Sequence, residues 1–422
     1  MMETNPTASV LITDAQERSV VGAIRALDAA GYRVEATTHT RLSPGQCSRS
    51  CSQHHRVPSS SANDEAFVGR LEEIVKRRAY AALLAGSDAS LLAISQHRAR
   101  LEPHVEIGLP SHDVVRRALS KVELASEAGA VGFRTPRSSV CENGEQAQEA
   151  ARELGFPVMA KSASALVVAD GRIVRPDSRL IADAAAMSAW LGRQVGPVLI
   201  QGRERGHVYS CPGVMTADGL VGFALARYIR TWPTRAGNAS FAETVSPPES
   251  LRESVAALLD RMGWRGIFEL ELMGSEEDGF VAIDLNPRVY GSLALSTRAG
   301  ASLPALWCDV LLGRPVVAAV ARPGVCYRWE EGETRNLGAF ARRGSWHAAL
   351  EVMRPRHDCA HAEFSIHDPG PLAARALLTM KNAVRKSVNS RGPGRTAAAS
   401  RLPGAGTDQF PPTDRSSHAP TS

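Results

Sequence analysis

The sequence predicts a multidomain protein of mixed class, α/β at its N-terminus and α+β beyond it. A strand, a helix and a second strand follow one another within residues 8–38, a βαβ unit that requires a parallel sheet. From residue 198 onward, short strands separated by tight turns are typical of antiparallel hairpins. The length of 422 residues exceeds one ordinary core and favours two or three domains.

The N-terminal region, residues 1–115, is predicted to be a small α/β domain. Residues 8–13 are short and β-branched, as in a buried strand, and the helix predicted at 18–30 has its apolar side chains at helical spacing and stops at Gly31. The next strand is predicted at 32–38. The alternation continues with a helix, a strand and a helix at 65–78, 81–84 and 90–100. The first turn has no G-x-G-x-x-G motif, so nothing there indicates a dinucleotide site.

The remaining chain is predicted to form four further regions. We assign 116–197 and 198–320 to two α+β subdomains, 321–386 to a mixed C-terminal region, and 387–422 to a disordered tail because it consists mainly of Pro, Gly, Ser, Ala and Arg. The elements predicted within them are helices at 113–119, 121–128, 145–154, 181–191 and 251–262, strands at 157–161, 198–201, 208–215, 220–228, 267–272 and 280–285, and a helical stretch after Gly291.

Composition excludes several classes of function. Apolar residues make up 44% of the chain and charged residues 22%, which fits a globular protein. A net charge of +5 with only 5% aromatic residues does not predict a nucleic-acid groove. No run of 18 apolar residues predicts a membrane span, and the N-terminus has no signal-peptide pattern. The seven scattered cysteines do not predict a disulfide framework, so we expect a cytoplasmic protein.

The sharpest chemical signal lies in the two strands on either side of the acidic turn 275–279. Alternation places Glu269 and Glu271 on one face of the first strand, and Asp284 and Asn286 on one face of the second. Pairing across the turn would set Glu271 beside Asp284, with Asn286 two residues further on. Two carboxylates and an amide oxygen are ligands that Mg²⁺, or Mn²⁺, prefers. The alternative is an exposed hairpin with a polar face.

The residues around this hairpin resemble the metal-binding core of the ATP-grasp superfamily. The run I-D-L-N-P-R-V-Y-G-S at 283–292 is similar to the family pattern E-x-N-P-R-x-x-G-S, and Glu271 follows Gly266 at the family spacing. Matches are spread over residues 8–315, and the chain resembles the carboxylate–amine ligase branch and the ATP-binding domains of carbamoyl-phosphate synthase. The resemblance implies a Rossmann-like pre-ATP-grasp domain followed by an ATP-grasp domain of two α+β subdomains.

The resemblance also implies nucleotide-binding positions. Lys121 and Lys161 correspond to the two lysines that approach the ATP phosphates. Gln201, Gly202 and Glu204 lie at the hinge where family members hold adenine with backbone groups. The cofactors implied are ATP and Mg²⁺.

Three arginines match cations of the family's catalytic site. Arg227 and Arg230 resemble those facing the γ-phosphate and the acyl phosphate, and Arg288 resembles the one that touches the reacting carboxylate or phosphate. Two departures are present: Asp284 stands where glutamate is usual, and the run Ser-Ala-Ser-Ala-Leu at 162–166 replaces a glycine-rich lid.

The function implied is that of an ATP-dependent ligase that activates a carboxylate as an acyl phosphate for attack by an amine, so the partners expected are small-molecule acids and amines. The alternative is a non-catalytic ATP-binding or partner-binding module with a degenerate site, which the two departures favour.

Two other sets of potential metal ligands are present: Cys47, Cys51, His54 and His55, and then His357, Cys359, His361, Glu363 and His367. The first set lies in a Ser- and Arg-rich stretch with no second Cys/His pair at zinc-finger spacing, so we expect a plain loop. The second set is expected to be a polar strand near the surface.

Overall fold

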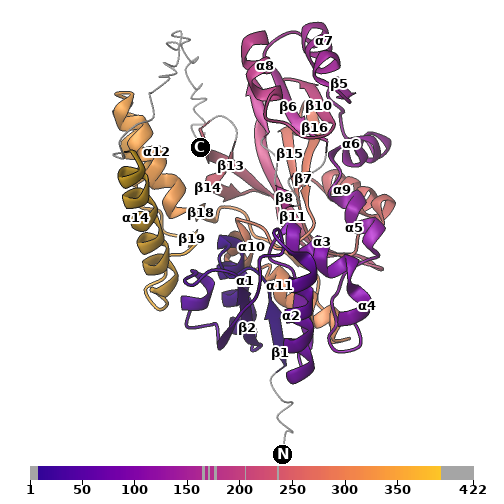
Figure 1. Cartoon of the computed structure of the whole chain (residues 1–422), viewed down its shortest axis with the longest axis vertical. Coiled ribbons are helices and arrows are strands. Elements are labelled where there is room, and N and C mark those ends of the chain that lie inside the picture. The colour runs from indigo at the N-terminus through magenta and orange to yellow at the C-terminus, as the bar shows by residue number, and fades with distance from the viewer. Residues whose placement is uncertain are drawn as a thin grey trace, which may run out of the picture. The chain divides into compact units, whose positions relative to one another are not determined.

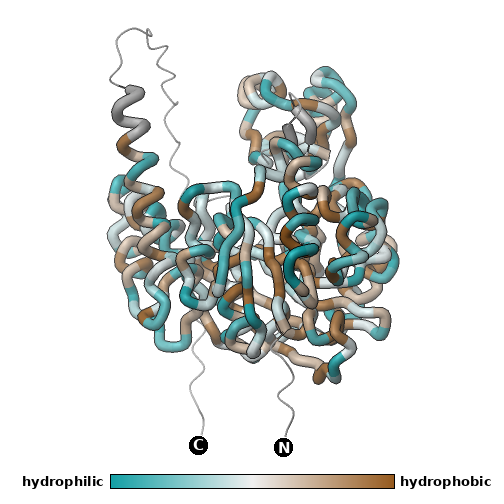
Figure 2. The backbone as a smooth tube through the Cα atoms, turned by 60° about the horizontal axis from the view of Figure 1, so that its bottom comes forward, coloured by the Kyte–Doolittle hydropathy of each residue, from teal (hydrophilic) through white to brown (hydrophobic). Residues whose placement is uncertain are grey.

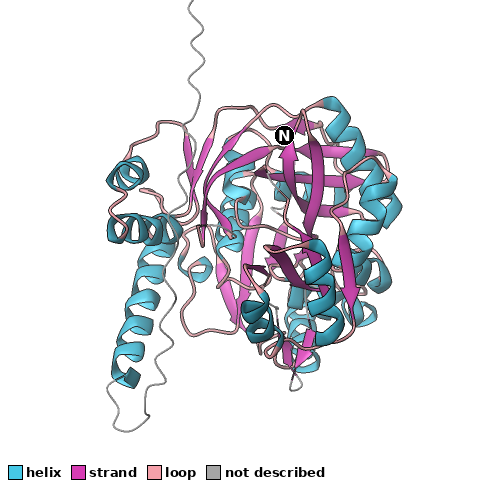
Figure 3. Ribbon diagram, turned by 90° about the horizontal axis from the view of Figure 1, so that it is seen from above, coloured by secondary structure: helices cyan, strands magenta, loops and turns pink. Residues whose placement is uncertain are grey.

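In the computed structural model of the chain, the described residues are 8–163, 167–169, 172–174, 178–204, 206–234 and 237–390. The chain divides into two compact units, residues 1–378 and 379–422. In the first unit the strands lie in the interior and the helices cover them, as Figures 1 and 3 show.

The N-terminal domain is a parallel sheet of four strands in the order β3-β2-β1-β4. Its elements are β1 (Ser9–Ile12), α1 (Arg18–Ala29), β2 (Arg33–Thr38), the 3₁₀ turn η1 (Gly45–Cys47), β3 (Gln53–Arg56), α2 (Asp64–Arg77), β4 (Ala82–Leu84), α3 (Asp88–Gln96) and α4 (Arg98–Leu101). The predicted βαβ unit is confirmed. The single helix predicted at 90–100 is two helices that meet at His97.

A second, antiparallel sheet has the strand order β5-β10-β6-β9. Its elements are β5 (Ser138–Cys141), α7 (Gly144–Leu154), β6 (Val158–Ser162), β9 (Arg179–Ile181), α8 (Ala184–Leu191) and β10 (Val198–Gly202), with a separate hairpin of β7 (Val167–Ala169) and β8 (Arg172–Val174). Helices α7 and α8 lie together above this sheet in Figure 1. The helix predicted from 181 begins at Ala184, because Ile181 pairs with Val158 in the sheet. Since β10 is a central strand here, this sheet extends beyond the predicted boundary at residue 197.

The largest sheet has nine strands and places the predicted metal ligands. Its strands are β11 (His207–Thr216), β12 (Gly219–Phe223), β13 (Ala226–Trp232), β14 (Asn238–Thr244), β15 (Gly266–Ser275), β16 (Gly279–Asn286), β17 (Ala319–Val320), β18 (Cys326–Arg328) and β19 (Cys359–His361). Helices associated with this part are α5 (His112–Ala118), α6 (Lys121–Ala130), α9 (Glu249–Met262), α10 (Leu293–Arg298) and α11 (Leu303–Leu311).

Two predicted elements in this region are interrupted. The strand predicted at 220–228 is two strands, because the chain leaves β12 at Ala224, whose N–H donates to the Pro212 carbonyl, and re-enters the sheet as β13. The helical stretch after Gly291 is two helices that are separated at Gly300, which has a φ of 100°.

The C-terminal region supplies strands β18 and β19 of the nine-stranded sheet. It also contains α12 (Glu330–Arg342), α13 (Trp346–Met353) and α14 (Gly370–Ser390). Helix α14 extends to Ser390, past the predicted start of the tail at 387. The rest of that predicted disordered segment, 391–422, lies outside the described residues.

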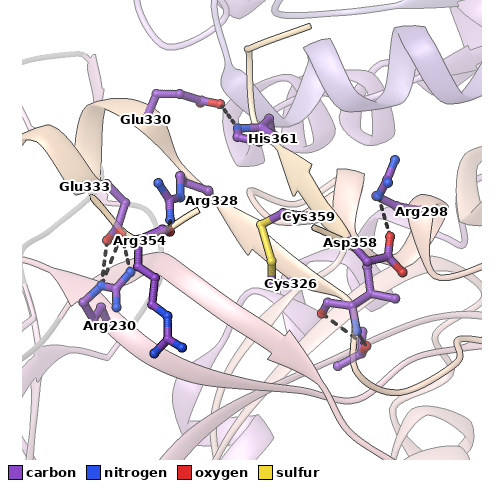
Figure 4. Close-up of a disulfide and its surroundings, with 12 residues drawn as sticks. Arg230, Arg298, Cys326, Arg328, Glu330, Glu333, Arg354, Asp358, Cys359 and His361 are labelled. Carbon is purple, nitrogen blue, oxygen red and sulfur yellow. Dashed lines mark hydrogen bonds and ion pairs between the residues drawn. A yellow bond between two sulfur atoms is a disulfide. The ribbon is translucent and has the colours of Figure 1, made fainter. Parts of the chain in front are cut away.

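A disulfide joins Cys326 and Cys359, which corrects the expectation that the cysteines form no disulfide. The two residues face each other in register on the neighbouring parallel strands β18 and β19, and they pack against Phe241. The close-up in Figure 4 shows this bond. The expectation failed because the two cysteines are 33 residues apart in the sequence. The pairing of β18 with β19, which the sequence did not predict, brings them together.

Besides the small cluster at the disulfide, three larger hydrophobic cores lie among the described residues of the first unit. One joins α2 and α3 of the N-terminal domain to α9 and β15, and the second joins α1 to α10 and α11. The third, around Trp190 and Met187, belongs to the second sheet alone. Hydrophobic and hydrophilic segments alternate along the helices in Figure 2, as expected where one face of a helix is buried. Within the described residues, no helix has both the length and the apolar character needed to cross a membrane.

Candidate functional site

The predicted pairing of the two acidic strands is confirmed. In the register of β15 with β16, Glu271 lies opposite Asp284 and Glu269 lies opposite Asn286. Because residues paired across an antiparallel ladder share a face of the sheet, these four polar side chains form one group. All four line the same pocket.

Hydrogen bonds from neighbouring side chains fix the orientation of this group. The Tyr228 hydroxyl donates to Glu271 Oε1 at 2.9 Å. Asn286 Nδ2 donates to Glu269 Oε2 at 3.1 Å, and the Ser210 hydroxyl donates to Glu269 Oε1 at 2.5 Å. Since its Nδ2 is engaged by Glu269, the Asn286 amide presents Oδ1 on its other side. Burial raises the pKa of Glu269, while the hydrogen bond from Ser210 acts to lower it.

Both predicted nucleotide lysines approach the acidic strands. Lys121 Nζ, at the start of α6, lies 3.8 Å from Asp284 Oδ2. Lys161 Nζ, on β6 of the other sheet, donates to the Ile283 carbonyl at 3.4 Å. Burial lowers the pKa of Lys161 to about 8, the charge of Lys121 adds to that shift, and Asp284 and Glu271 oppose it. The fold thus brings two cations from different elements to one strand end.

Arg288 lines the pocket and is held by the N-terminal domain. Its Nε donates to Asp88 Oδ1 at 2.5 Å and its Nη2 donates to Asp88 Oδ2 at 3.1 Å. Nη2 also donates to Asn286 Oδ1 and Nη1 donates to the Val289 carbonyl, so all three guanidinium nitrogens are engaged within the protein. Arg288 therefore orients Asn286 and ties it to helix α3.

The predicted hinge residues lie where β10 leaves the second sheet. Gln201 is buried on β10, and the Gly202 N–H donates to the Arg137 carbonyl at 2.8 Å. Glu204 forms an ion pair of 3.0 Å with Arg134, whose backbone N–H donates to the Phe280 carbonyl of β16. This segment therefore connects the second sheet to the strand that carries Asp284.

The structure does not bring Arg227 and Arg230 to the acidic group. Arg227 pairs in register with Tyr209 and alternates with Tyr228 along β13, so it faces the opposite side of the sheet from Glu271. Arg230 pairs with Glu333 of α12, and its guanidinium lies 4.4 Å above the Phe241 ring. Figure 4 shows this pair beside the disulfide.

The pocket has a volume of about 760 Å³ and is lined by the N-terminal domain, the central part with the acidic hairpin, and the C-terminal region, with no described residue from the second sheet. Its wall comprises Gln16, Glu17, Arg18, Ser19, Ser61, Gly86, Ser87, Asp88 and Ala89 from the N-terminal domain, Asn238, Glu269, Glu271, Asp284, Asn286, Arg288 and Gly291 from the central part, and Trp329, Glu331 and Arg375 from the C-terminal region.

Neither of the other two ligand sets is arranged to hold a metal: among the described residues, no group of three or more His, Cys, Asp or Glu side chains is suitably placed. His55 instead lies 2.8 Å from Glu35 on the edge strand β3, where we expected a loop. His361 lies 3.0 Å from Glu330. The metal ligands predicted on β15 and β16 are not a group of that kind, because they are two carboxylates, Glu271 and Asp284, and the amide oxygen of Asn286.

Comparison with solved structures identifies the architecture. No protein-family model and no curated protein matches the chain. It is similar to an N5-carboxyaminoimidazole ribonucleotide synthetase in complex with ADP, with a TM-score of 0.59 and 13% identity over 81% of this chain and 85% of the other. It is also similar to the biotin carboxylase domain of 2-oxoglutarate carboxylase from Hydrogenobacter thermophilus (TM-score 0.56, 14% identity, 75% and 73% covered) and to an L-amino acid ligase from Bacillus licheniformis (0.54, 11%, 73% and 75%). The chain has the ATP-grasp fold.

Within this ATP-grasp fold, sequence reasoning missed residues that support or complete the site. Asp88 and Arg18 come from the N-terminal domain and Trp329 from the C-terminal region, so no local spacing links them to the acidic hairpin. Tyr228 was missed because the expectation placed its neighbour Arg227 at the site, and alternation along β13 puts the two side chains on opposite faces of the sheet.

Proposed function

We propose that this protein is a ligase that uses Mg²⁺ and ATP to activate a carboxylate as an acyl phosphate, which an amine then attacks. The observation that supports this most is the convergence of Glu271, Asp284 and Asn286 with Lys121 and Lys161 beside one pocket. Two anions, a nucleoside triphosphate and a carboxylate, react in such a site only if their charges are neutralised.

The residues present fit a divalent cation. Glu271 and Asp284 supply hard carboxylate oxygens from adjacent strands, and Asn286 supplies an amide oxygen whose orientation is set by Glu269 and Arg288. Mg²⁺ and Mn²⁺ both take such oxygen ligands. Because the protein supplies only a few of the ligands, coordination positions stay open for phosphate oxygens and water. The cation would neutralise charge on the phosphates during transfer.

The chemistry has two steps. A carboxylate oxygen of the acid attacks the γ-phosphorus of ATP, the bond to the bridging oxygen breaks, and ADP leaves. The amine nitrogen then attacks the acyl carbon, phosphate leaves, and the nitrogen loses a proton to water. Lys121 and Lys161 would bind phosphate oxygens as point charges, while the protein positions both reactants and supplies no covalent nucleophile.

Release of ADP tests this proposal. The purified chain is incubated with Mg²⁺, ATP and a panel of small acids, with and without an amine, and ADP is measured. At least one acid should stimulate ADP release, and Glu271→Gln should lower that rate by about a hundredfold or more. Glu276→Gln in the exposed turn between the strands is the matched control and should retain the rate.

A non-catalytic ATP-binding module is the second candidate, favoured by the shorter carboxylate at Asp284. Thermal stabilisation by Mg²⁺ and ATP, without ADP release for any acid, would support it over the ligase. Absence of Mg²⁺-dependent nucleotide binding would exclude both.

A further inference from the structure

Three arginines of the described chain line the pocket, and two of them are engaged by carboxylates. Arg288 is bound by Asp88, and Arg375 is bound by Glu363 at 2.7 Å. Arg18 differs from both. It forms no ion pair or hydrogen bond with any residue that the structure describes, and its guanidinium stacks on the ring of Trp329.

The surroundings of Arg18 hold its guanidinium rigidly. Its Cζ atom lies 4.0 Å from the centroid of the Trp329 ring, the geometry of a cation–π stack. It also lies over the backbone of Gly291, where an added Cβ would be only 2.5 Å from Nη2. Gly291 has no positive φ, so what its missing side chain provides here is space for the Arg18 guanidinium and not a special backbone conformation. The tryptophan comes from the C-terminal region and the glycine from the end of the acidic hairpin.

No acid of the pocket wall forms an ion pair or hydrogen bond with Arg18 among the described residues, although the charge of Arg18 acts to lower the pKa of Glu269 and of Glu17. Glu331, two residues after Trp329, is 2.5 Å from Arg335 on its own helix. Glu17 precedes Arg18 in the chain and also lines the pocket; burial raises its pKa, and the charges of Arg288, Arg375 and Arg18 act to lower it.

A guanidinium held flat with unoccupied N–H groups suits bidentate binding of a carboxylate or phosphate. Such a grip occupies both oxygens of a carboxylate, whereas one oxygen of the reacting carboxylate must be available to attack phosphorus. Bidentate binding by Arg18 therefore suits an anionic group of the substrate that does not react.

We propose that Arg18, stacked on Trp329 and seated over Gly291, binds a second, non-reacting anionic group of the acid substrate. This deepens the proposed function, on which it rests, by assigning the acid to a class: small acids that carry a further carboxylate or a phosphate. Trp329 makes the C-terminal region part of the specificity pocket, because it supplies the surface that fixes Arg18.

Matched pairs of acids test this assignment. Each pair differs in one anionic group: succinate and butyrate, L-glutamate and L-glutamine, 3-phosphoglycerate and glycerate. Thermal stabilisation is measured with Mg²⁺ and ADP present, and ADP release is measured with ATP and hydroxylamine as a general trap for acyl phosphates. We expect the dianionic member of at least one pair to act at concentrations about tenfold or more below its partner. The pair that responds distinguishes a carboxylate from a phosphate.

Variants then locate the effect. Arg18→Met should abolish the preference for the dianionic acid, Arg18→Lys should restore part of it, and Trp329→Leu should weaken it. Arg77→Met, the same change at an exposed site on α2, should leave it intact. Mg²⁺-dependent binding of ADP should be unchanged in all four, which shows that they are folded.

Two results overturn the assignment: equal action of both members in every pair, including no action of either, or an unchanged preference in Arg18→Met. Either result leaves Mg²⁺-dependent ADP release by some other acid open, so the ligase proposal is judged separately.

Discussion

At the scale of the residue, the site depends on side chains whose charge and orientation are set by neighbours. Asn286 is held on one side by Glu269 and on the other by Arg288. Lys161 is nearly enclosed, which lowers its pKa to about 8. The first effect arises within the acidic hairpin and the residues just after it, and the second from the approach of β6 to β16, which is distant in sequence.

Asp284→Asn should weaken binding of Mg²⁺-ATP about tenfold or more, because it removes one of the two carboxylates in register and the acidic partner of Lys121. Binding is measured by calorimetry with Mg²⁺ and a non-hydrolysable ATP analogue. Asp278→Asn, in the exposed turn, is the control. Equal affinity of the Asp284 variant and the wild type would remove Asp284 from the cation site.

The affinity for Mg²⁺-ATP should depend on the protonation of Lys161. Below pH 8 its ammonium is charged and attracts phosphate. As the pH rises through about 8 the free protein loses this charge, so the apparent Kd should increase, by at most about tenfold per pH unit. Kd is measured from pH 7 to 9.5 in wild type and in Lys161→Gln. The variant should bind more weakly and show a flatter profile, and parallel profiles would contradict the assignment.

At the scale of the element, strand pairing decides which side chains meet. The register of β15 with β16 could be predicted, since a single tight turn joins two strands with alternating acidic residues. The pairing of β18 with β19 could not, because helices α12 and α13 separate these strands. That second pairing forms the disulfide and supports the segment that ends at Trp329.

Removal of the disulfide should destabilise the protein. Closure of a loop of 33 residues is worth roughly 3–4 kcal/mol in the chain-entropy account. The double variant Cys326→Ala, Cys359→Ala should therefore melt at a lower temperature than the oxidised wild type. Dithiothreitol should lower the melting temperature of the wild type and leave that of the double variant unchanged. A wild type that is insensitive to dithiothreitol would show that the bond does not contribute to stability.

At the scale of the whole molecule, the C-terminal region packs against the N-terminal domain, and both line the pocket. Asp368 accepts hydrogen bonds from Arg25 Nε at 2.9 Å, the Ser48 hydroxyl at 2.6 Å and the Arg49 N–H at 2.9 Å. Arg375, seven residues later, donates to the Gln16 carbonyl in the turn just before α1, the helix that begins at Arg18. These contacts join the C-terminal region to the N-terminal domain beside the pocket that contains Arg18.

Asp368→Asn should destabilise the protein by about 2 kcal/mol at pH 7, because it replaces a carboxylate held by three donors. The hydrogen bonds hold the pKa of Asp368 below its ordinary value of 3.8, so its stabilising effect is complete above that pH and is lost as the pH falls through the lower pKa of the folded state. Urea unfolding at pH 7 and 5 should show the same deficit, which should shrink below pH 4. A deficit that is independent of pH there would refute an ionic role.

The sequence by itself determined the class of the fold and the centre of the site. Period-two and helical patterns placed most helices and strands, and the hairpin placed Glu271 beside Asp284, because both signals are local. The run at 283–292 with Lys121 and Lys161 was sufficient to suggest the ATP-grasp fold, which the structure confirms.

Only the tertiary structure decided which cations face the pocket. Arg227 and Arg230 match the family pattern in sequence, yet the alternation of β13 and the pair with Glu333 direct them elsewhere. Arg18 and Trp329, more than 300 residues apart, meet only after the C-terminal region packs on the N-terminal domain. The physical reason is that a charged side chain takes its role from the partners that folding brings to it, and most of these lie beyond the reach of local pattern.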